Sequence, residues 1–469
     1  MSLIADLTAL IGPSHVLNGT DMDRFAKDWP GKFTAEPVAV VRPGSTDEVA
    51  ACVKCAARHG VPIVPISGNT GLTGGTMTVG GLMISTERLN RIREIRADAR
   101  LAVVEAGVIL SRLHDAAEAQ SLFFPLWFGA RGSAMIGGVL STNAGGSNVL
   151  RYGSTRQLCL GIEVVLADGR ILNLMSELHK DNSGYDLKDL FIGAEGTLGI
   201  ITAAVMKLVP APLAHATATL AARSLPDALT LLNRLQLASG GAVEAFEFMP
   251  ATYLRRLQAI RPDLGQPFAN IPDVAILVEL GATAPRLAAV SDDGSTPLTD
   301  LLEETLGGMM DDGLVLDAVI ARSDTQRRAM WARREAAAEI TFAIHPFIDT
   351  DVAVPLDKVE AFLTAIHDRL PHLDPDAETV TVAHLGDGNL HFTVVPRDND
   401  PDLADRIVTA IEDVVADLGG SFSAEHGVGL SKLNSMSRRK DPVALSVMRA
   451  IKAALDPDNR MNPGKVIPK

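Results

Sequence analysis

The chain has 469 residues, of which 47% are hydrophobic and 21% charged, and its formal net charge is −14. This length allows two or three domains with large cores, and the composition is typical of a soluble globular protein. The acidic balance argues against nucleic acid or an anionic membrane as a partner, because either would need a basic surface. No apolar run reaches membrane-spanning length, and the N-terminus lacks the basic start and long apolar core of a signal peptide. We therefore expect a cytoplasmic protein.

Three cysteines are too few for a disulfide framework. Cys52 and Cys55 have CxxC spacing, but they fall inside an expected amphipathic helix over 46–59 that begins at a Ser45 or Thr46 cap. Both would lie on one face of that helix, and no second CxxC completes a metal site. We therefore expect packed thiols rather than a redox or zinc pair.

Helix and strand patterns alternate from 37 to about 209. AVVRP, VPIVPI, LMIS and AVVEAG are typical of short buried strands, and GIEVVLADGRILNL predicts a hairpin with Asp168 and Gly169 at its turn. GIITAAVMKLVP predicts a further strand, after which Pro210 and Pro212 close the region. The helices expected here cover 46–59 and 109–120.

A new pattern follows from 213 to about 419, and it indicates an α+β domain built around one sheet. The expected helices cover 226–238, 251–260, 297–307 and 324–340. The expected strands cover 243–248, 274–280, 314–319, 350–354, 379–383 and 390–395. The tail contains a helix over 441–455 and a Pro/Asn/Gly-rich ending.

Three glycine-rich loops lie in the first region. PISGNTGLTGG (65–75) follows a strand, so its N–H groups could form a nest around a diphosphate. It has no lysine of a P-loop and does not fit GxGxxG. Two further loops, within 129–154 and 193–200, are rich in Gly, Ser, Thr and Asn. Together they predict a large phosphate-bearing cofactor.

Two runs near the C-terminus, HLGDGNLH and SAEHGVG, place imidazoles and a carboxylate among glycines. His384, His391 and Glu425 could give a two-histidine, one-carboxylate set for a divalent ion. His426 would then be a candidate general base, since its pKa is naturally near neutral. On one continuous strand the two histidines would face opposite ways, but GDGN is strong turn chemistry and could fold them together. A purely structural pair is the alternative.

At these loops the chain resembles the FAD-binding superfamily of vanillyl-alcohol oxidase and p-cresol methylhydroxylase, in its D-lactate and D-2-hydroxyglutarate dehydrogenase branch. The resemblance rests on RPGSTDEV, GNTGLTGG, IGGVLSTNAGG, LRYGS, KDNSGYDLKDLFIGAEGTLGIIT, HLGDGNLH, EHGVG and LDPDNRMNPGKV, and spans nearly the whole chain. It implies an α+β fold with a two-subdomain FAD-binding domain over 1–212. A substrate or cap domain with a ferredoxin-like sheet would cover 213–419. A C-terminal helical segment, 420–469, would return to the flavin.

The resemblance also implies cofactor-binding residues. Those for the diphosphate are Gly68, Asn69, Thr70, Gly71, Leu72, Gly137, Gly138 and Ser141. Those lining the rest of the cofactor cleft are Asn143, Gly145, Gly146, Tyr152, Glu195, Gly196, Ile200, Asn462 and Lys465. Relatives that link FAD covalently place a histidine in the first loop, where this chain has Asn69, so we expect dissociable FAD.

The implied chemistry oxidises a 2-hydroxy acid to a 2-oxo acid. A metal on His384, His391 and Glu425, which could be Zn, Mn, Fe or Co, would stabilise the developing alkoxide while His426 takes the proton. Hydride would pass from C2 to flavin N5. Asn389 would bond the substrate or orient the site.

A substrate carboxylate calls for a forked donor, and the W-x-x-R-E register of RRAMWARREAAAEI selects Arg334. The alternative is a solvated arginine, since this helix carries four arginines and long basic side chains on helices are mostly solvated.

The chain departs from the D-2-hydroxyglutarate pattern near this helix. That group has a lysine a few residues before D-x-S-x-P, where this chain has Asp349 and Thr350, and a threonine where Ala338 stands. TDVAVP instead resembles the D-lactate and glycolate branch, so Asp349 and Thr350 are the expected substrate contacts. We predict a D-2-hydroxy acid dehydrogenase, with lactate-like or larger monocarboxylates ahead of hydroxyglutarate.

The expected electron acceptor is external: a quinone, an electron-transfer flavoprotein or a cytochrome. An oxidase using O2, an FAD-binding subunit of a larger complex and, more distantly, a metallohydrolase are the alternatives, and a homodimer is left open.

Overall fold

The computed structural model describes residues 2–292 and 294–469, and the chain divides into two compact units. The first comprises Met1–Gly145, Gly153–Pro210 and Glu425–Lys469; the second comprises Gly146–Tyr152 and Ala211–Ala424. The boundaries expected from the sequence lie at 212 and 419, and the placement of Gly146–Tyr152 was not foreseen. Within the described residues, no helix is long and apolar enough to cross a membrane.

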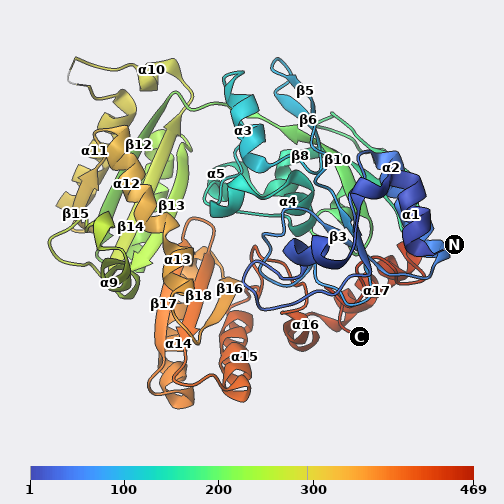
Figure 1. Cartoon of the computed structure of the whole chain (residues 1–469). Coiled ribbons are helices and arrows are strands. Elements are labelled where there is room, and N and C mark those ends of the chain that lie inside the picture. Colours follow the sequence, from blue (N-terminus) through green and yellow to red (C-terminus); the bar gives the residue numbers. More distant parts are fainter. Residues whose placement is uncertain (1, 293) are drawn as a thin grey trace. The chain divides into compact units, whose positions relative to one another are not determined.

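The first unit contains two main sheets (Figure 1). One has the order β1-β2-β4-β3, in which β2, β4 and β3 are parallel and β1 is antiparallel. The other is antiparallel, with the order β5-β6-β10-β8-β9. The strands are β1 (Val16–Leu17), β2 (Ala39–Val41), β3 (Ile63–Ile66), β4 (Leu82–Ser85), β5 (Ile92–Arg96), β6 (Leu101–Glu105), β8 (Cys159–Val165), β9 (Ile171–Leu174), β10 (Ile200–Lys207) and a small pair, β7 (Leu122–Phe123) with β11 (Val209–Pro210).

Three helices of this unit, over 46–58, 110–118 and 442–455, match helices expected from the sequence, and the others were not predicted. The full set is α1 (Leu3–Ile11), α2 (Thr46–Arg58), α3 (Leu110–Glu118), α4 (Ile136–Thr142), α6 (Thr155–Leu158), α7 (Lys188–Phe191), α16 (Leu433–Arg439) and α17 (Pro442–Leu455). Ser45 caps α2, since its side chain accepts from Glu48 N. Cys52 and Cys55 are fully buried in the core, as expected, and burial raises the pKa of Cys52 to about 12.

The predicted hairpin over β8 and β9 is confirmed. Gly169 has a φ of +79°, which favours glycine, and the Asp168 carboxylate accepts the N–H of Arg170 across the turn. This hairpin forms one edge of the five-stranded sheet.

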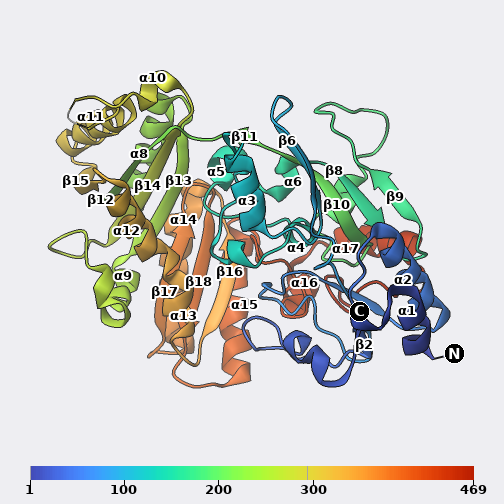
Figure 2. The same ribbon diagram turned by 45° about the horizontal axis from the view of Figure 1, so that its top comes forward.

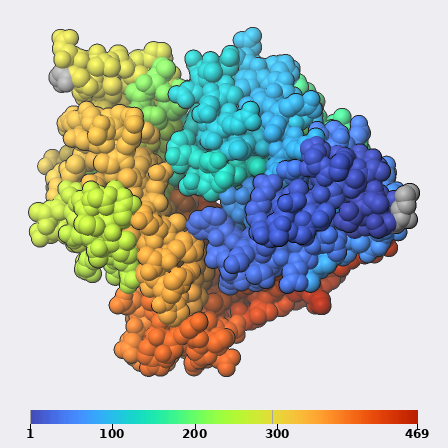
Figure 3. Space-filling view, in the orientation of Figure 1, coloured from blue at the N-terminus to red at the C-terminus, as the bar shows by residue number. Residues whose placement is uncertain are grey.

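The C-terminal segment returns to the N-terminal part of the first unit. Ile63 N donates to Arg460 O, and Asn462 N donates to Ile63 O, both at 2.7 Å. Figure 3 shows the segment, in red, along the surface of the blue N-terminal part. Asn462 and its neighbours therefore lie beside β3, the strand that leads into the first glycine loop.

The second unit is built on one antiparallel sheet of seven strands, in the order β15-β12-β14-β13-β17-β18-β16 (Figures 1 and 2). The strands are β12 (Ala214–Ala222), β13 (Val243–Pro250), β14 (Val274–Ala282), β15 (Val315–Ile320), β16 (Ile348–Ala353), β17 (Glu378–His384) and β18 (Asn389–Val395). This confirms the α+β fold class.

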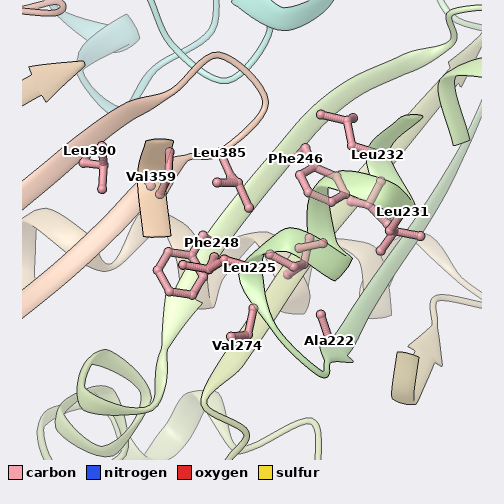
Figure 4. Close-up of a cluster of buried hydrophobic side chains, with 14 of the residues drawn as sticks. Ala222, Leu225, Leu231, Leu232, Phe246, Phe248, Val274, Val359, Leu385 and Leu390 are labelled. Carbon is pink, nitrogen blue, oxygen red and sulfur yellow. The ribbon is translucent and has the colours of Figure 1, made fainter. Parts of the chain in front are cut away.

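Helices cover both faces of this sheet. They are α8 (Leu225–Ser239), α9 (Ala251–Ile260), α10 (Pro285–Ala288), α11 (Pro297–Asp311), α12 (Asp324–Glu335), α13 (Ala337–Phe342), α14 (Val359–Leu373) and α15 (Pro401–Asp417), with the short α5 (Val149–Tyr152). Phe246 and Phe248 of β13 pack toward Leu225 and Leu231 of α8, in the larger apolar cluster (Figure 4). Between them, Glu247 faces the other side, the one covered by α9, α12 and α13.

Several features differ from the expected pattern. The strand β12, which lies between β15 and β14 in the sheet, was not predicted. The helix expected over 324–340 breaks at Ala336, whose ψ of −6° departs from the helical value of about −42°, so α12 ends and α13 begins there. In addition, α14 and α15 lie in stretches for which no helix was predicted.

Candidate functional site

The first glycine loop follows β3 and is fixed by close packing. A Cβ added at Gly68 would lie 2.3 Å from Ser133 O, so no side chain fits there, whereas one added at Gly71 would meet no atom within 4 Å. Asn69 has a φ of +50°; its amide group donates to Lys27 O and accepts from Thr76 Oγ1, both at 2.8 Å. Within the described residues, the N–H groups of Asn69, Thr70 and Gly71 have no acceptor, which fits a ligand with phosphate oxygens.

The second loop surrounds α4. A Cβ at Gly137 would lie 2.8 Å from the Cβ of Ala106, so glycine lets the helix approach the end of β6. Ser141 Oγ donates to Gly137 O at 2.7 Å, and Asn143, with a φ of +50°, accepts Arg156 N on its side chain. These two predicted cofactor contacts therefore use their side chains to shape the loop.

Tyr152 and Gly146 lie in the second unit. The Tyr152 hydroxyl donates to Glu244 Oε1 at 2.6 Å, and Arg151 donates to the same oxygen at 2.9 Å. The Tyr152 side chain, which was predicted to line the cofactor cleft, is thus bonded to a buried carboxylate that joins α5 to β13.

The third loop supports the run that follows His426. Glu195, with a φ of +50°, accepts the N–H groups of Val428 and Gly429 on its two carboxylate oxygens, at 2.7 and 2.8 Å. Burial raises the pKa of Glu195 even though these bonds act against it. Gly429 is required here, because an added Cβ would lie 2.3 Å from Thr73 O. Glu195 therefore holds a loop.

Two further residues of the third loop region differ in their surroundings. A Cβ on Gly196, whose φ is +73°, would lie 2.7 Å from Pro65. Ile200 is 1% exposed and packs in an apolar cluster, and its predicted cofactor contact stays a prediction.

Asn462 and Lys465 place buried polar groups in the first unit, and some of these groups have no hydrogen-bond or ion-pair partner among the described residues. Asn462 Nδ2 donates to Gly75 O and Glu195 O, at 2.9 and 2.7 Å, whereas its buried Oδ1 has no partner among the described residues. Lys465 is 6% exposed, and burial lowers its pKa to about 8. Within the same described part, no carboxylate pairs with Lys465. These groups fit an anionic, hydrogen-bonding ligand such as FAD.

In the second unit, the turn between β17 and β18 brings the two histidines together. Val382 pairs with His391, so His384, two residues further along β17, projects from the same face. Their ring centroids are 5.4 Å apart, with the planes at 81°. Gly388, with a φ of +79°, allows the turn, which confirms that GDGN folds the two histidines toward each other.

A buried carboxylate lies behind each of these histidines. Glu247 Oε1 is 2.8 Å from His384 Nδ1, and Asp351 Oδ1 is 3.9 Å from His391 Nδ1. A neutral imidazole whose Nδ1–H points to a carboxylate presents Nε2 as its metal donor. The donor set therefore fits a divalent metal.

Glu247 also meets the predicted substrate arginine. Arg334 Nε donates to Glu247 Oε2 at 2.7 Å, and Arg334 is only 8% exposed. Burial acts to raise the pKa of Glu247, but the charges and hydrogen bonds of His384 and Arg334 outweigh it and lower that pKa. Arg334 Nη2 is buried and has no partner among the described residues. Arg334 is thus a buried side chain, unlike Arg328, whose side chain is 77% exposed.

The remaining predicted substrate contacts surround Asp351. Asn389 Nδ2 donates to Asp351 Oδ1 at 2.9 Å and to Val352 O at 3.0 Å, so Asn389 orients that carboxylate. Asp349 lies on the same face as Asp351, is exposed and accepts from Thr393 Oγ1. Thr350 projects from the opposite face and donates to Phe392 O, so strand alternation disagrees with its predicted substrate contact.

Glu425 and His426 open the last segment of the first unit, directly after Ala424. A Cβ added at Gly145 would lie 2.4 Å from Glu425 Oε1, so Gly145 makes room for that carboxylate. Because Glu425 belongs to one unit and the histidines to the other, their joint ligand set stays a prediction, as does the role of His426.

Sequence reasoning missed Glu247, Asp351 and the loop-holding role of Glu195. For Glu247 a signal existed: a carboxylate inside the apolar run AFEFM must be paired to be buried. The sequence did not show which residues pair with it.

Comparison with known proteins agrees with this geometry. Residues 37–175 match the family described as FAD binding domain, and residues 211–466 match FAD linked oxidases, C-terminal domain. The chain is 36% identical over 454 residues to a D-2-hydroxyglutarate dehydrogenase of Xanthomonas citri pv. viticola, covering 95% of this chain and 92% of that one. It is 34% identical over 476 residues to one of Stutzerimonas stutzeri, covering 99% and 98%.

Solved structures show the same fold. Substrate-bound p-cresol methylhydroxylase gives a TM-score of 0.74 at 17% identity, covering 99% of this chain and 96% of that one. The 4-ethylphenol oxidase from Gulosibacter chungangensis gives 0.71 at 19% identity, covering 100% and 97%. The chain shares the fold of these structures, and its match to the FAD binding domain family defines a flavoprotein. The chain belongs to the FAD-linked oxidase family and is an oxidoreductase.

Proposed function

We propose that this protein oxidises a D-2-hydroxy acid to the 2-oxo acid, using FAD and a divalent metal, and passes the electrons to an external acceptor. The polar face of β13, β17 and β18 carries the proposal, because it combines two carboxylate-backed histidines with the buried guanidinium of Arg334. The relatives named D-2-hydroxyglutarate dehydrogenase support the same class of substrate.

FAD fits the first unit through three kinds of group that have no partner among residues 2–292 and 294–469: N–H groups of the first glycine loop, the buried Oδ1 of Asn462 and the cation of Lys465. When bound, FAD supplies the acceptor for the hydride that leaves the substrate C2. We propose that it is dissociable, since Asn69 stands where covalent relatives have histidine. The chain itself contributes a diphosphate cradle and a cationic group.

A divalent metal fits His384 and His391, and Glu425 completes the proposed ligand set. When bound, the metal, which we take to be Zn²⁺, supplies charge stabilisation for a developing alkoxide. His426 takes the hydroxyl proton in this proposal, and an imidazole suits that task near neutral pH. Glu247 orients His384 through the 2.8 Å contact with its Nδ1, and the Asp351 carboxylate lies 3.9 Å from Nδ1 of His391.

Arg334 is proposed to bind the carboxylate next to the reacting carbon, through the Nη edge that Glu247 leaves open. The identity of the side chain is a separate matter. The relatives favour hydroxyglutarate, whereas the exposed carboxylate of Asp349 on the face of His391 disfavours a second anionic group and favours a monocarboxylate such as lactate.

The proposed acceptor is external because three cysteines cannot ligate an iron–sulfur cluster of the four-cysteine kind. Oxidase activity is the alternative, and O2 consumption during turnover would distinguish it.

Anaerobic flavin reduction tests the proposal. The purified protein is mixed with both enantiomers of lactate and 2-hydroxyglutarate, with and without a chelator, and flavin absorbance is followed. Bleaching by D enantiomers alone, suppressed by the chelator, is the expected result. A protein that takes up no FAD, or whose flavin no 2-hydroxy acid reduces, would contradict the proposal.

Two variants of α12 sharpen this test. Arg334→Met should lower kcat/KM about 30-fold or more, because truncating one partner of a buried charged hydrogen bond costs about 2–5 kcal/mol. Arg328→Met, on the exposed side of the same helix, should leave kcat/KM unchanged. Equal effects of the two variants would remove Arg334 from the substrate site.

A further inference from the structure

Glu247 divides its two carboxylate oxygens between two functional groups. Oε1 lies 2.8 Å from His384 Nδ1, and Oε2 accepts Arg334 Nε at 2.7 Å. Glu247 pairs directly with His384 across β13 and β17, whereas Arg334 comes from α12, which runs along the sheet with α13 after it (Figures 1 and 2). One carboxylate, 1% exposed, thus joins three elements.

The same face of the sheet offers a comparison in Glu279. Arg327, seven residues before Arg334 on α12, donates to Glu279 through both Nε and Nη2, at 2.7 and 2.6 Å. Trp331 and Thr217 donate to Glu279 as well. This forked pair is the common arginine–carboxylate geometry, and it satisfies both charges.

Arg334 and Glu247 forgo that fork. Because Oε1 is given to His384, Arg334 uses only Nε, and its Nη2 stays buried without a partner among the described residues. An unsatisfied buried donor costs about 1–3 kcal/mol. A bound carboxylate would accept a hydrogen bond from Nη2 of Arg334. Arg327 cannot bind a ligand in this way, because Glu279 already accepts from both its Nε and its Nη2.

We propose that Glu247 is a positioning residue that ties the metal-binding His384 to the substrate-binding Arg334. Its carboxylate selects the His384 tautomer with a hydrogen on Nδ1, so that Nε2 is the metal donor, and it fixes the guanidinium plane by one edge. This inference rests on the proposed function, since it assumes the roles given to His384 and Arg334.

The test compares Glu247→Gln with Glu279→Gln in the FAD-loaded protein. Each protein is stripped of metal and titrated with Zn²⁺ alone against a chromophoric chelator, without substrate, and its FAD content and melting temperature are measured. Glu247→Gln should weaken Zn²⁺ binding about 10–100-fold, the usual effect of losing a carboxylate behind a ligand histidine. Glu279→Gln should keep the wild-type Zn²⁺ affinity, although its melting temperature falls.

A second measurement addresses the arginine. The 2-oxo acid product, added to the oxidised protein as a non-reacting ligand, should bind more weakly to Glu247→Gln than to the wild-type protein. If Glu247→Gln fails to fold, Glu247→Asp replaces it, because the shorter side chain keeps the charge but cannot reach both partners. Reduced Zn²⁺ affinity of that variant is then the expected result.

The outcomes separate the inference from the function beneath it. Wild-type Zn²⁺ affinity in the Glu247 variant, or equal losses in the Glu279 variant, would overturn the positioning role while leaving the metal site intact. A wild-type protein that binds no Zn²⁺ yet is reduced by D-2-hydroxy acids would overturn both the metal assignment and this inference, but not the dehydrogenase.

Discussion

Gly68 and Gly71 lie three residues apart in the first glycine loop. A single added methyl group at these two positions should affect the stability of the FAD-free protein differently. A Cβ at Gly68 would lie 2.3 Å from Ser133 O and 3.1 Å from the Cα of Ala134, so the loop must move. At Gly71 the Cβ would meet no described atom within 4 Å. If the cofactor diphosphate occupies that space, the methyl group at Gly71 would clash with FAD but with no part of the described protein.

The magnitudes follow from these contacts. Overpacking costs about 1–3 kcal/mol, so Gly68→Ala should destabilise the FAD-free protein by that amount and lower its melting temperature by several degrees. Gly71→Ala should leave the FAD-free protein as stable as the wild type, or slightly more stable, since alanine restricts the unfolded chain. The same cost of about 1–3 kcal/mol, applied to the bound ligand, weakens FAD binding about 5- to 150-fold in both variants.

Thermal melting of the FAD-free protein and fluorescence titration with FAD measure the two effects separately. Gly307→Ala is the control, because Gly307 is exposed on α11 and its added Cβ meets nothing within 4 Å. Wild-type FAD affinity in Gly71→Ala would refute the placement of the diphosphate at this loop. A wild-type melting temperature in FAD-free Gly68→Ala would refute the packing argument.

Three other outcomes follow from buried groups. Glu195→Gln should speed hydrogen exchange at Val428 and Gly429, because the amide NH2 that replaces one carboxylate oxygen cannot accept the N–H group bonded there; unchanged exchange would contradict this role. FAD affinity should weaken as the pH rises above about 8, where Lys465 loses its proton and the charge an anionic ligand needs, and Lys465→Met should abolish this dependence; a pH-dependent variant would exclude Lys465 as the cause. The thiol of Cys52, whose pKa is raised to about 12, should react with a disulfide reagent at pH 8 only after unfolding, and rapid reaction of the native protein would show that this site opens.

The parts of the structure that the sequence predicted depend on local signals, such as turn residues and helix caps. The turn signal in GDGN was sufficient to bring His384 and His391 together, and the cap at Ser45 was sufficient to begin α2. Long-range pairing is different. Glu247 meets His384 across 137 positions of sequence, and this contact depends on β17 lying next to β13 in the strand order. No local pattern specifies such an order.

The helices α14 and α15 were missed for another reason. Asp400 caps α15 and Pro401 occupies its first turn, which is a recognisable start signal that the sequence prediction did not use. In α14, Pro371 lies inside the last turn, a position where proline is normally unfavourable. Both helices pack on the apolar face of the sheet. Their apolar stripes are therefore stabilised by contacts with that face, which are not visible in the local sequence.

The buried carboxylates on the other face explain why this sheet is more than a scaffold. Buried ion pairs are weak sources of stability, since well-packed apolar residues often replace them without loss. Glu279 holds α12 through Arg327, and because Arg334 lies seven residues further on, about two turns, that pair also sets the helical register of Arg334 over the sheet. Glu247 then receives an arginine already in place, and its second oxygen can serve His384. Because Glu279 and Arg327 already hold α12 on the sheet, Glu247 is not needed for that task. Its carboxylate can therefore orient the reactive groups His384 and Arg334.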